Sequence, residues 1–496
     1  MASRRQNNLN TMNSALSGSR SSLDNTETAS ASVRPPRVIG FVDLFLFYVV
    51  TGISLRWIAT AASAGPSAIT VWIGAWCCFF IPLLLSVTEL ASRYPQEGGL
   101  YIWSKRNFGD FAGFIAAWTY WTSNLPYFPS ALYFAASNAV YVGGARWKHL
   151  SDSPTYYICF SLLGLAVITI LNVVGLNVAK WLHNVGAFGM WIPVAIIIVM
   201  GLIAWHRFGS ATRFTVASLV PDVHLKNMIY WATLTFALGG SETASLMGDE
   251  VKNARSAIPR ALFLGGIVVT LCYIFGTICT LLVLPSHQIS DLQGLMQAIT
   301  LSTERLHWFG MVPICGTLIA VSNIGAVGAY LAATARLPFV AGIDHVLPSA
   351  FGRLHPRWQT PYVALLVQSG VAAVFVFLGQ AGTTVHGAYD VLVSMGIITY
   401  FVPYLFVFAS MFRTQWKEPE QDAFRVPGKK PAAIVFSCIG FVATSFTIVL
   451  SLIPAADEPN KLLATMKVVG LTGILILAGA LLYWIKKGTK RELPAS

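Results

Sequence analysis

Twelve apolar segments constrain the fold of this chain more than any other feature of its sequence. About 20 consecutive apolar residues are needed to span the hydrocarbon core of a bilayer. Because that core offers no water to the backbone, such a chain crosses it as helices. We therefore predict an all-α polytopic membrane protein with 12 transmembrane helices. The segments lie at residues 38–63, 67–91, 108–142, 154–174, 178–205, 228–249, 260–284, 308–335, 361–379, 388–412, 432–453 and 464–485.

Charge content and charge placement agree with this prediction. Only 11% of the 496 residues are charged, whereas soluble proteins average about 25%, which excludes a soluble multidomain enzyme. If the N-terminus is cytoplasmic, 24 of the 33 Lys and Arg residues fall on the cytoplasmic side, eight fall outside, and Arg56 lies within the first segment. The positive-inside rule then places both termini in the cytoplasm. The net charge of +12 is therefore no sign of a nucleic-acid partner.

The first segment is interrupted near its middle. Thr51, Gly52, Ile53 and Ser54 bring a glycine and small polar residues into the apolar run, and Arg56 follows. Glycine weakens a helix, and an arginine at mid-bilayer depth costs about 2.5–3.5 kcal/mol on insertion scales. A span that carries both at one depth indicates a functional site.

The sixth segment carries a matching interruption, which comprises Phe236, Ala237, Gly239, Gly240, Ser241 and Glu242. Glycine-interrupted segments at corresponding positions of two halves are the best sequence indication of a transporter's central site. The first and sixth segments correspond if segments one to five and six to ten are repeats. Five spans in each repeat would make the repeats inverted in the membrane.

This pairing predicts the domain organisation. We expect a disordered cytoplasmic tail at residues 1–37, which are rich in Ser, Asn, Thr and Ala. The predicted parts that follow are a first five-helix repeat at 38–205, a second, inverted five-helix repeat at 228–412, helices eleven and twelve at 432–486, and a cytoplasmic tail at 487–496.

A broken membrane helix offers unpaired backbone groups to a ligand. The N–H groups that begin its outer half lie at the positive end of the helix dipole, where an α-carboxylate can bind. Carbonyls freed in the sixth segment can accept hydrogen bonds from an ammonium group. The alternative is that Gly52 and the Gly239-Gly240 pair only allow helices to pack closely.

Three loops resemble those of the amino acid–polyamine–organocation (APC) permeases. They are Glu89 to Trp103 with Phe108-Gly109 after the second segment, Gly248 to Arg260 after the sixth, and Ala335 to Pro338 through Leu347-Pro348 to Thr360-Pro361 after the eighth. The resemblance covers nearly the whole chain apart from its N-terminal tail, and the pattern resembles that of the glutamate/γ-aminobutyrate exchangers and related bacterial permeases. It implies a LeuT-type 5+5 inverted repeat plus two extra helices, and transport of amino acids or polyamines.

The resemblance also implies roles for single residues. The substrate-binding positions that it assigns are Thr51, Gly52, Ile53, Ser54, Phe236, Ala237, Gly239, Gly240 and Ser241. Ser241 stands where the family usually has an aromatic residue, so Phe236 or a third-span aromatic such as Trp118, Tyr120 or Trp121 would close the site instead. Residues 184–191 lack the lysine that some members carry in the fifth span, which argues against proton coupling through that residue.

Arg56 and Glu242 are the candidate gating or coupling residues. Arg56 could pair with Glu242, contact the substrate, or extend its charge to the membrane surface. The candidate cavity-lining residues of the third segment are Tyr120, Trp121 and Asn124, with anchoring at the lipid interface as the alternative for the aromatic ones. Asp43 and Glu89 are expected to be helix-end or cytoplasmic-gate charges rather than substrate ligands.

Together these features predict a secondary amino acid transporter of the cell membrane that works by alternating access, through proton symport or substrate exchange. A polyamine transporter is the alternative of the same fold, and a non-transporting amino acid sensor is the alternative of another class. No nucleotide-binding loop or nucleophile–base arrangement indicates an enzyme. No cofactor is expected, and the seven cysteines and nine histidines form no metal-ligand spacing. The expected partners are an amino acid, protons and membrane lipid, and the oligomeric state stays open.

Overall fold

Every regular element in the described part of this computed structural model is a helix. The structure describes residues 40–94, 99–174, 176–221, 225–240, 251, 253–308, 310–335, 346–417, 423–454 and 458–492. The predicted N-terminal tail at 1–37 lies outside these residues, as does the segment 241–250, which includes Ser241 and Glu242. The predicted all-α fold class is confirmed.

The first predicted span consists of two helices. Between α2 (Phe41–Gly52) and α3 (Leu55–Ser63), the backbones of Ile53 and Ser54 are extended, with φ/ψ of −93°/131° and −132°/125°. The break therefore falls within the Thr-Gly-Ile-Ser stretch, as the sequence predicts. Extended backbone at this depth has no helical hydrogen bonds, so other groups must satisfy its N–H and C=O groups.

The sixth predicted span is also interrupted. Its helix α12 (Leu225–Ala237) ends before a turn at Leu238, and Gly239 and Gly240 follow outside the helix. Gly240 has a φ of +105°, which residues with a Cβ rarely adopt. The next described helix is α14 (Ala254–Val283), and the second half of the sixth span lies outside the described residues.

Nine stretches of helix within the described residues are long and apolar enough to cross a membrane. The three remaining predicted spans are the interrupted ones, namely the first, the sixth and the third, which consists of α7 (Asp110–Thr122) and α8 (Asn124–Ala139). The uninterrupted spans are α4 (Ser67–Ala75) continuing through the π-helical η2 (Trp76–Phe80) into α5 (Ile81–Arg93), α9 (Pro154–Val174), α10 (Leu176–Phe208), α14, α16 (Met311–Thr334), α18 (Tyr362–Gln380), α19 (Val385–Thr414), α20 (Lys429–Leu450) and α21 (Lys461–Glu492).

Short helices connect the spans. Connections on the side where α3 ends contain η3 (Val140–Leu150), α11 (Val216–Leu219), η5 (Ser286–Gln288) and α15 (Gly294–Leu306). Connections on the side where α5 ends contain α6 (Leu100–Phe108) and η7 (Ser349–Gly352). In the orientation predicted from the basic loops, the first set is extracellular and the second is cytoplasmic.

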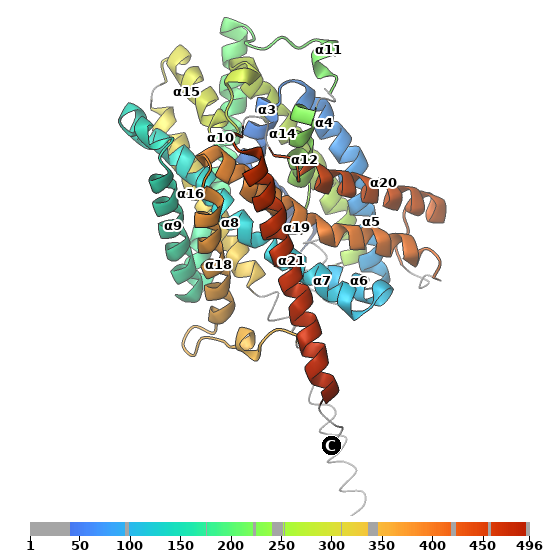
Figure 1. The fold of residues 1–496 in the computed structure, drawn as a ribbon. Helices are drawn as coiled ribbons and strands as arrows, with labels where there is room; N and C mark the ends of the chain where they lie inside the picture. Colours follow the sequence, from blue (N-terminus) through green and yellow to red (C-terminus); the bar gives the residue numbers. More distant parts are fainter. Residues whose placement is uncertain are drawn as a thin grey trace, which may run out of the picture. The chain divides into compact units, whose positions relative to one another are not determined.

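The two interrupted spans meet through their neighbours. Helix α14 packs along both α2 and α3, while α12 lies beside α3 and contacts α19. Figure 1 shows α3, α12 and α14 grouped together, with α19 next to them. The largest buried apolar cluster surrounds this group and includes Leu55, Ile58, Trp72 and Tyr273. The fold therefore brings both helix breaks into one densely packed region.

A buried carboxylate ties α5, α19 and the start of α20 together. Glu89 is 1% exposed, and its Oε1 accepts hydrogen bonds from the Arg93 guanidinium (2.5 Å) and the Gln415 amide (2.9 Å). Its Oε2 accepts the backbone N–H of Val426 at 2.8 Å. Arg93 also donates to the carbonyl of Thr414 at 3.3 Å. These contacts agree with the interpretation of Glu89 as a helix-end charge.

Replacing Glu89 with Gln should lower thermal stability strongly. The substitution removes the charge partner of buried Arg93 and places an amide N–H₂ among donors, and breaking a buried ion pair costs about 3–5 kcal/mol. Asp110→Asn is the matched control, because the Lys105–Asp110 pair (3.2 Å) is largely exposed and such pairs contribute about 0–1 kcal/mol. Thermal unfolding of the purified protein measures both variants, and equal melting temperatures would contradict this assignment.

Candidate functional site

The break in the first span is bridged by a single tyrosine hydroxyl. Tyr273 on α14 donates to the carbonyl of Gly52 at 2.8 Å and accepts the N–H of Ser54 at 3.0 Å. Its side chain is fully buried, so water does not compete for these bonds. One hydroxyl thus satisfies a carbonyl and an N–H that the extended backbone leaves without helical partners.

The Tyr273 ring is itself fixed by its neighbours. It stacks on the indole of Trp72, with ring centroids 4.6 Å apart and ring planes 6° from parallel. The Trp72 indole N–H donates to the Thr277 hydroxyl at 3.3 Å, one helical turn beyond Tyr273. Close packing also contributes here, because a Cβ on Gly52 would lie 3.1 Å from Val269 of α14. Gly52 therefore ends α2 at the break and also allows α14 to pack closely against it. From the sequence alone, these two roles were alternatives.

Arg56 is buried next to this break, with 2% of its surface exposed. Its Nε donates to the Ser54 hydroxyl at 3.3 Å, and one of its terminal nitrogens donates to Ser130 of α8 at 3.2 Å. Its guanidinium carbon lies 4.4 Å from the Trp57 ring centroid and 5.0 Å from that of Tyr127. This burial does not fit a side chain that extends to the membrane surface.

Hydroxyls and aromatic rings surround the Arg56 charge. Within the described residues, no carboxylate lies within ion-pair distance of Arg56. The predicted partner, Glu242, lies outside those residues, so the Arg56–Glu242 pair stays a prediction. Two of the five guanidinium N–H groups are used by serine hydroxyls, and the buried charge favours an anion beside it.

The end of α12 faces the start of α3. The rings of Trp57 and Phe236 meet edge to face with centroids 5.5 Å apart, and Phe236 also contacts Tyr400 of α19 at 5.1 Å. The buried Tyr404 hydroxyl accepts the N–H of Gly240 at 3.2 Å. Each break therefore has a tyrosine hydroxyl from a neighbouring helix, Tyr273 in one case and Tyr404 in the other.

The third-span candidates face different surroundings. Tyr120 stacks on Tyr400 with centroids 5.7 Å apart, which joins it to the aromatic group at the end of α12. Trp121 is 3% exposed and packs with Trp118 and Phe351 in a separate apolar cluster. Asn124 donates to the carbonyls of Tyr120 and Trp121 in its own span. Only Tyr120 of these three candidates has a ring contact with the group at the breaks.

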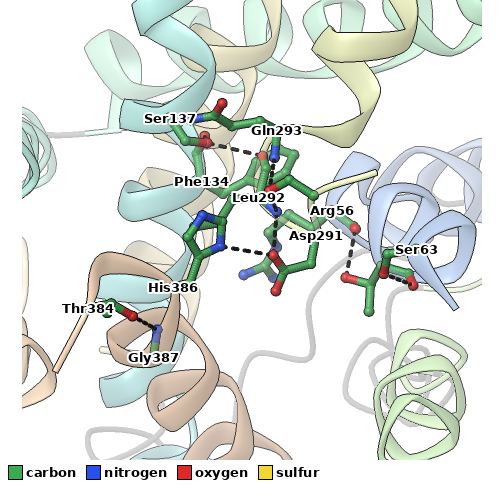
Figure 2. Close-up of polar contacts among 12 residues, drawn as sticks. Arg56, Ser63, Phe134, Ser137, Asp291, Leu292, Gln293, Thr384, His386 and Gly387 are labelled. Carbon is green, nitrogen blue, oxygen red and sulfur yellow. Dashed lines mark hydrogen bonds and ion pairs between the residues drawn. The ribbon is translucent and has the colours of Figure 1, made fainter. Parts of the chain in front are cut away.

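A second group of polar residues lies on the side of the protein where α3 ends. Asp291 in the segment before α15 and His386 at the start of α19 form a hydrogen bond, with Oδ1 and Nδ1 3.1 Å apart. Asp291 Oδ1 also accepts the N–H of Leu292, whose carbonyl accepts from Ser137 of α8 at 3.1 Å. Figure 2 shows this group with Arg56 in the same region. This Asp291–His386 group was not identified from the sequence. The signal in the sequence was a titratable residue near the end of each of two spans.

The remaining predicted positions are placed as follows. Ile53 is buried, Ser54 is partly exposed, and Thr51 lies in the last turn of α2. Ala237 is buried at the end of α12, and a Cβ on Gly239 would lie 2.8 Å from the Tyr400 ring. The structure thus brings the described candidates of the first and sixth spans together around Trp57, Phe236 and Tyr400.

Removing the Tyr273 hydroxyl should open the backbone at the break. In Tyr273→Phe, the carbonyl of Gly52 and the N–H of Ser54 lose a buried partner, which costs about 1–3 kcal/mol for each unsatisfied group. Hydrogen–deuterium exchange should therefore rise at residues 53–55. The control Tyr133→Phe removes a buried hydroxyl-to-carbonyl bond to Val376 away from the break. It should leave exchange at 53–55 unchanged, and equal exchange in both variants would contradict the bridge.

Comparison with known proteins adds a second line of evidence. Residues 39–479 match the family model described as amino acid permease. An uncharacterized transporter of Legionella pneumophila is 27% identical, over 86% of this chain and 91% of its own. The probable agmatine/putrescine antiporter AguD of Lactococcus lactis is 22% identical, over 88% and 93%. A glutamate/γ-aminobutyrate antiporter of Lactococcus lactis is 24% identical, over 81% and 80%.

These relatives are named as transporters, and none of the three is named as a sensor or an enzyme. The match begins within the first predicted span and ends within the twelfth, and nine membrane-length helices lie within the described residues. The chain therefore belongs to the amino acid permease family and is a multi-pass membrane protein that acts as a secondary transporter of small molecules.

Proposed function

We propose that the substrate is an amino acid whose carboxylate binds at the first turn of α3. The observation that carries this proposal is the buried Arg56 beside the open N-terminus of that helix. Ser54 precedes α3 but caps none of its N–H groups with its side chain, because its hydroxyl accepts from Arg56 instead. Unpaired N–H groups, the positive end of the dipole and a guanidinium all favour an anion at the same place.

The ammonium group would bind on the opposite side, at the end of α12. The last carbonyls of a helix lack partners within it and carry partial negative charge. The contact between Trp57 and Phe236, at 5.5 Å, holds the positive end of α3 near the negative end of α12. A zwitterion matches this pair of ends, with carboxylate and ammonium on adjacent atoms. Tyr120, Phe236 and Tyr400 would surround the side chain.

A polyamine is the competing substrate, since one relative is named as an agmatine/putrescine antiporter. Arg56 argues against it for this chain. A polyamine brings two or more positive charges and no anionic group. At a separation of a few ångströms, two like charges repel by roughly 4 kcal/mol at an effective dielectric constant near 20. A polyamine would therefore need carboxylates close to Arg56, and none of the described residues places one within ion-pair distance of it.

Coupling and location complete the proposal. The chain would act in the cell membrane with both termini cytoplasmic, as the 24-to-8 division of basic residues favours. Transport would proceed by alternating access, with α2 and α3 on one side and the two halves of the sixth span on the other moving around the bound substrate. The chain would either exchange one amino acid for another or carry an amino acid together with a proton. The experiment below distinguishes these two modes.

Uptake into proteoliposomes tests this proposal. Labelled amino acids and polyamines are offered to the purified chain, with and without a pH gradient and with or without unlabelled substrate inside. We expect amino acid uptake, accelerated by internal substrate in exchange or by a pH gradient in symport. The decarboxylated amine of the best substrate should not compete. Polyamine uptake without uptake of any amino acid would overturn the proposal.

Variants of Arg56 test its role in the same assay. Loss of a charge-assisted hydrogen bond costs about 1.5–3 kcal/mol, so Arg56→Gln should raise the KM for uptake about 10- to 100-fold. Arg56→Lys keeps the charge and should recover part of the loss. Arg213→Gln, at an exposed arginine, is the control. An unchanged KM in Arg56→Gln, with a well-folded protein, would exclude contact with the substrate.

A further inference from the structure

An apolar groove opens between α19, α20 and the end of α6. It has a volume of about 580 Å³, within the range of about 300–1,000 Å³ that is typical of small-molecule sites. Its wall includes Phe412, Cys438 and Phe441, and side chains at its edge are turned outward, such as Trp416 with 58% of its surface exposed. Because α19 and α20 are membrane spans, the exposed apolar side chains of the groove are expected to face lipid, and none of the candidate substrate-site residues lines it.

Two cations lie against the aromatic rings of this groove. Arg413 belongs to its wall, and its guanidinium carbon is 5.5 Å from the ring centroid of Phe108. The Nζ of Lys430, in the first turn of α20, is 4.6 Å from the ring centroid of Trp416. As far as the structure describes the chain, neither cation has a carboxylate within ion-pair distance. Within the described residues, the contacts of both cations at this end of the groove are therefore with aromatic rings rather than with carboxylates.

We propose that the groove binds an anionic phospholipid, with an acyl chain against the aromatic wall and the phosphate between Arg413 and Lys430. The almost wholly apolar wall does not suit a polar soluble ligand, and an uncharged lipid would not use the two cations. Basic pockets between membrane helices on the cytoplasmic side bind anionic headgroups. In the proposed orientation, the end of α19 and the start of α20 lie on that side.

The location of the site connects the lipid to the transport machinery. The groove lies against α19, which also carries Tyr400 and Tyr404, and these residues contact the end of α12. A lipid on α19 therefore packs against the helix that holds the second break. The proposed lipid site depends on the proposed orientation of the chain but not on which amino acid it carries. The lipid proposal and the amino acid proposal can therefore be disproved independently.

Acidic residues of the chain are the electrostatic competitors of the lipid. Glu418, Glu420 and Asp422 follow Lys417 in the sequence and lie outside the described residues. If they neutralised Arg413 and Lys430, removing their charges would create a preference for anionic lipid that the wild-type chain lacks. The triple variant Glu418→Gln/Glu420→Gln/Asp422→Asn is therefore part of the test.

Native mass spectrometry of the purified full chain tests the site with two lipids that have identical acyl chains, phosphatidylglycerol and phosphatidylcholine. Each of the two cations should strengthen binding of an anionic lipid by a similar factor. The wild-type chain should therefore bind phosphatidylglycerol about 10- to 30-fold more tightly than phosphatidylcholine. Arg413→Gln/Lys430→Gln should reduce this preference to near unity. Arg106→Gln, which removes a cation lying over the Tyr94 ring, should not change it.

Several results would overturn the proposal. Equal binding of the two lipids by the wild-type chain, or an undiminished preference in the double variant, would exclude a specific anionic site. A preference that emerges only in the triple acidic variant would assign the cations to the chain's own carboxylates. Cys438→Trp fills the groove and should weaken binding of both lipids. Unchanged lipid binding in Cys438→Trp would exclude the acyl-chain position. Displacement of the lipid by inorganic phosphate would exclude it as well. So would a dimer of the wild-type chain that Cys438→Trp dissociates, because the groove would then be covered by a second copy of the chain.

Discussion

The two hydrogen bonds of the Tyr273 hydroxyl are the interaction on which the rest of this structure depends. A membrane helix cannot leave its backbone unsatisfied at mid-depth, yet the first span contains a segment that is not helical. Tyr273 resolves this conflict because it accepts from Ser54 and donates to Gly52 within a fully buried environment. The stacked Trp72 holds the ring in place. Without such a bridge, the carbonyl of Gly52 and the N–H of Ser54 would be left without a partner in a buried environment.

The break matters because of what it exposes. Once α3 begins at Leu55, its first turn presents N–H groups, and Arg56 adds a full charge at the same depth. The facing end of α12 supplies the opposite polarity, and the contact between Trp57 and Phe236 holds the two ends together. In the proposed function, selectivity for a zwitterion would derive from these backbone dipoles, which would recognise the part common to all amino acids. The aromatic residues around it are left to discriminate among side chains.

Much of this arrangement could be predicted from the sequence. Glycine and small polar residues in apolar runs located both breaks, and span length located the helices. The partners of the breaks could not be found in this way, because Tyr273 lies 219 residues from Ser54 and Tyr404 lies 164 residues from Gly240. Polar aromatic residues inside apolar spans were the available signal. Adjacent residues of the third span, Tyr120 and Trp121, also face different clusters, and this follows from helix packing rather than local pattern.

The surroundings of Arg56 illustrate the same limit. The predicted partner, Glu242, lies outside the described residues, so that pairing stays a prediction. The described contacts of Arg56 are the hydroxyls of Ser54 and Ser130 and two aromatic rings, and sequence spacing did not indicate Ser130. Which side of α3 meets α8 is decided by tertiary packing. Within the described residues, Arg56 is held by these dispersed contacts and no carboxylate lies within ion-pair distance of it, which is the feature that the proposed carboxylate site uses.

A cryo-electron microscopy structure of the purified chain with a transported amino acid would test the central claim most directly. We predict that the substrate lies between the start of α3 and the end of α12. Its carboxylate should be within hydrogen-bonding distance of the first-turn N–H groups of α3 and of Arg56. A substrate whose carboxylate points away from α3, or one bound outside the space between the two breaks, would contradict the account.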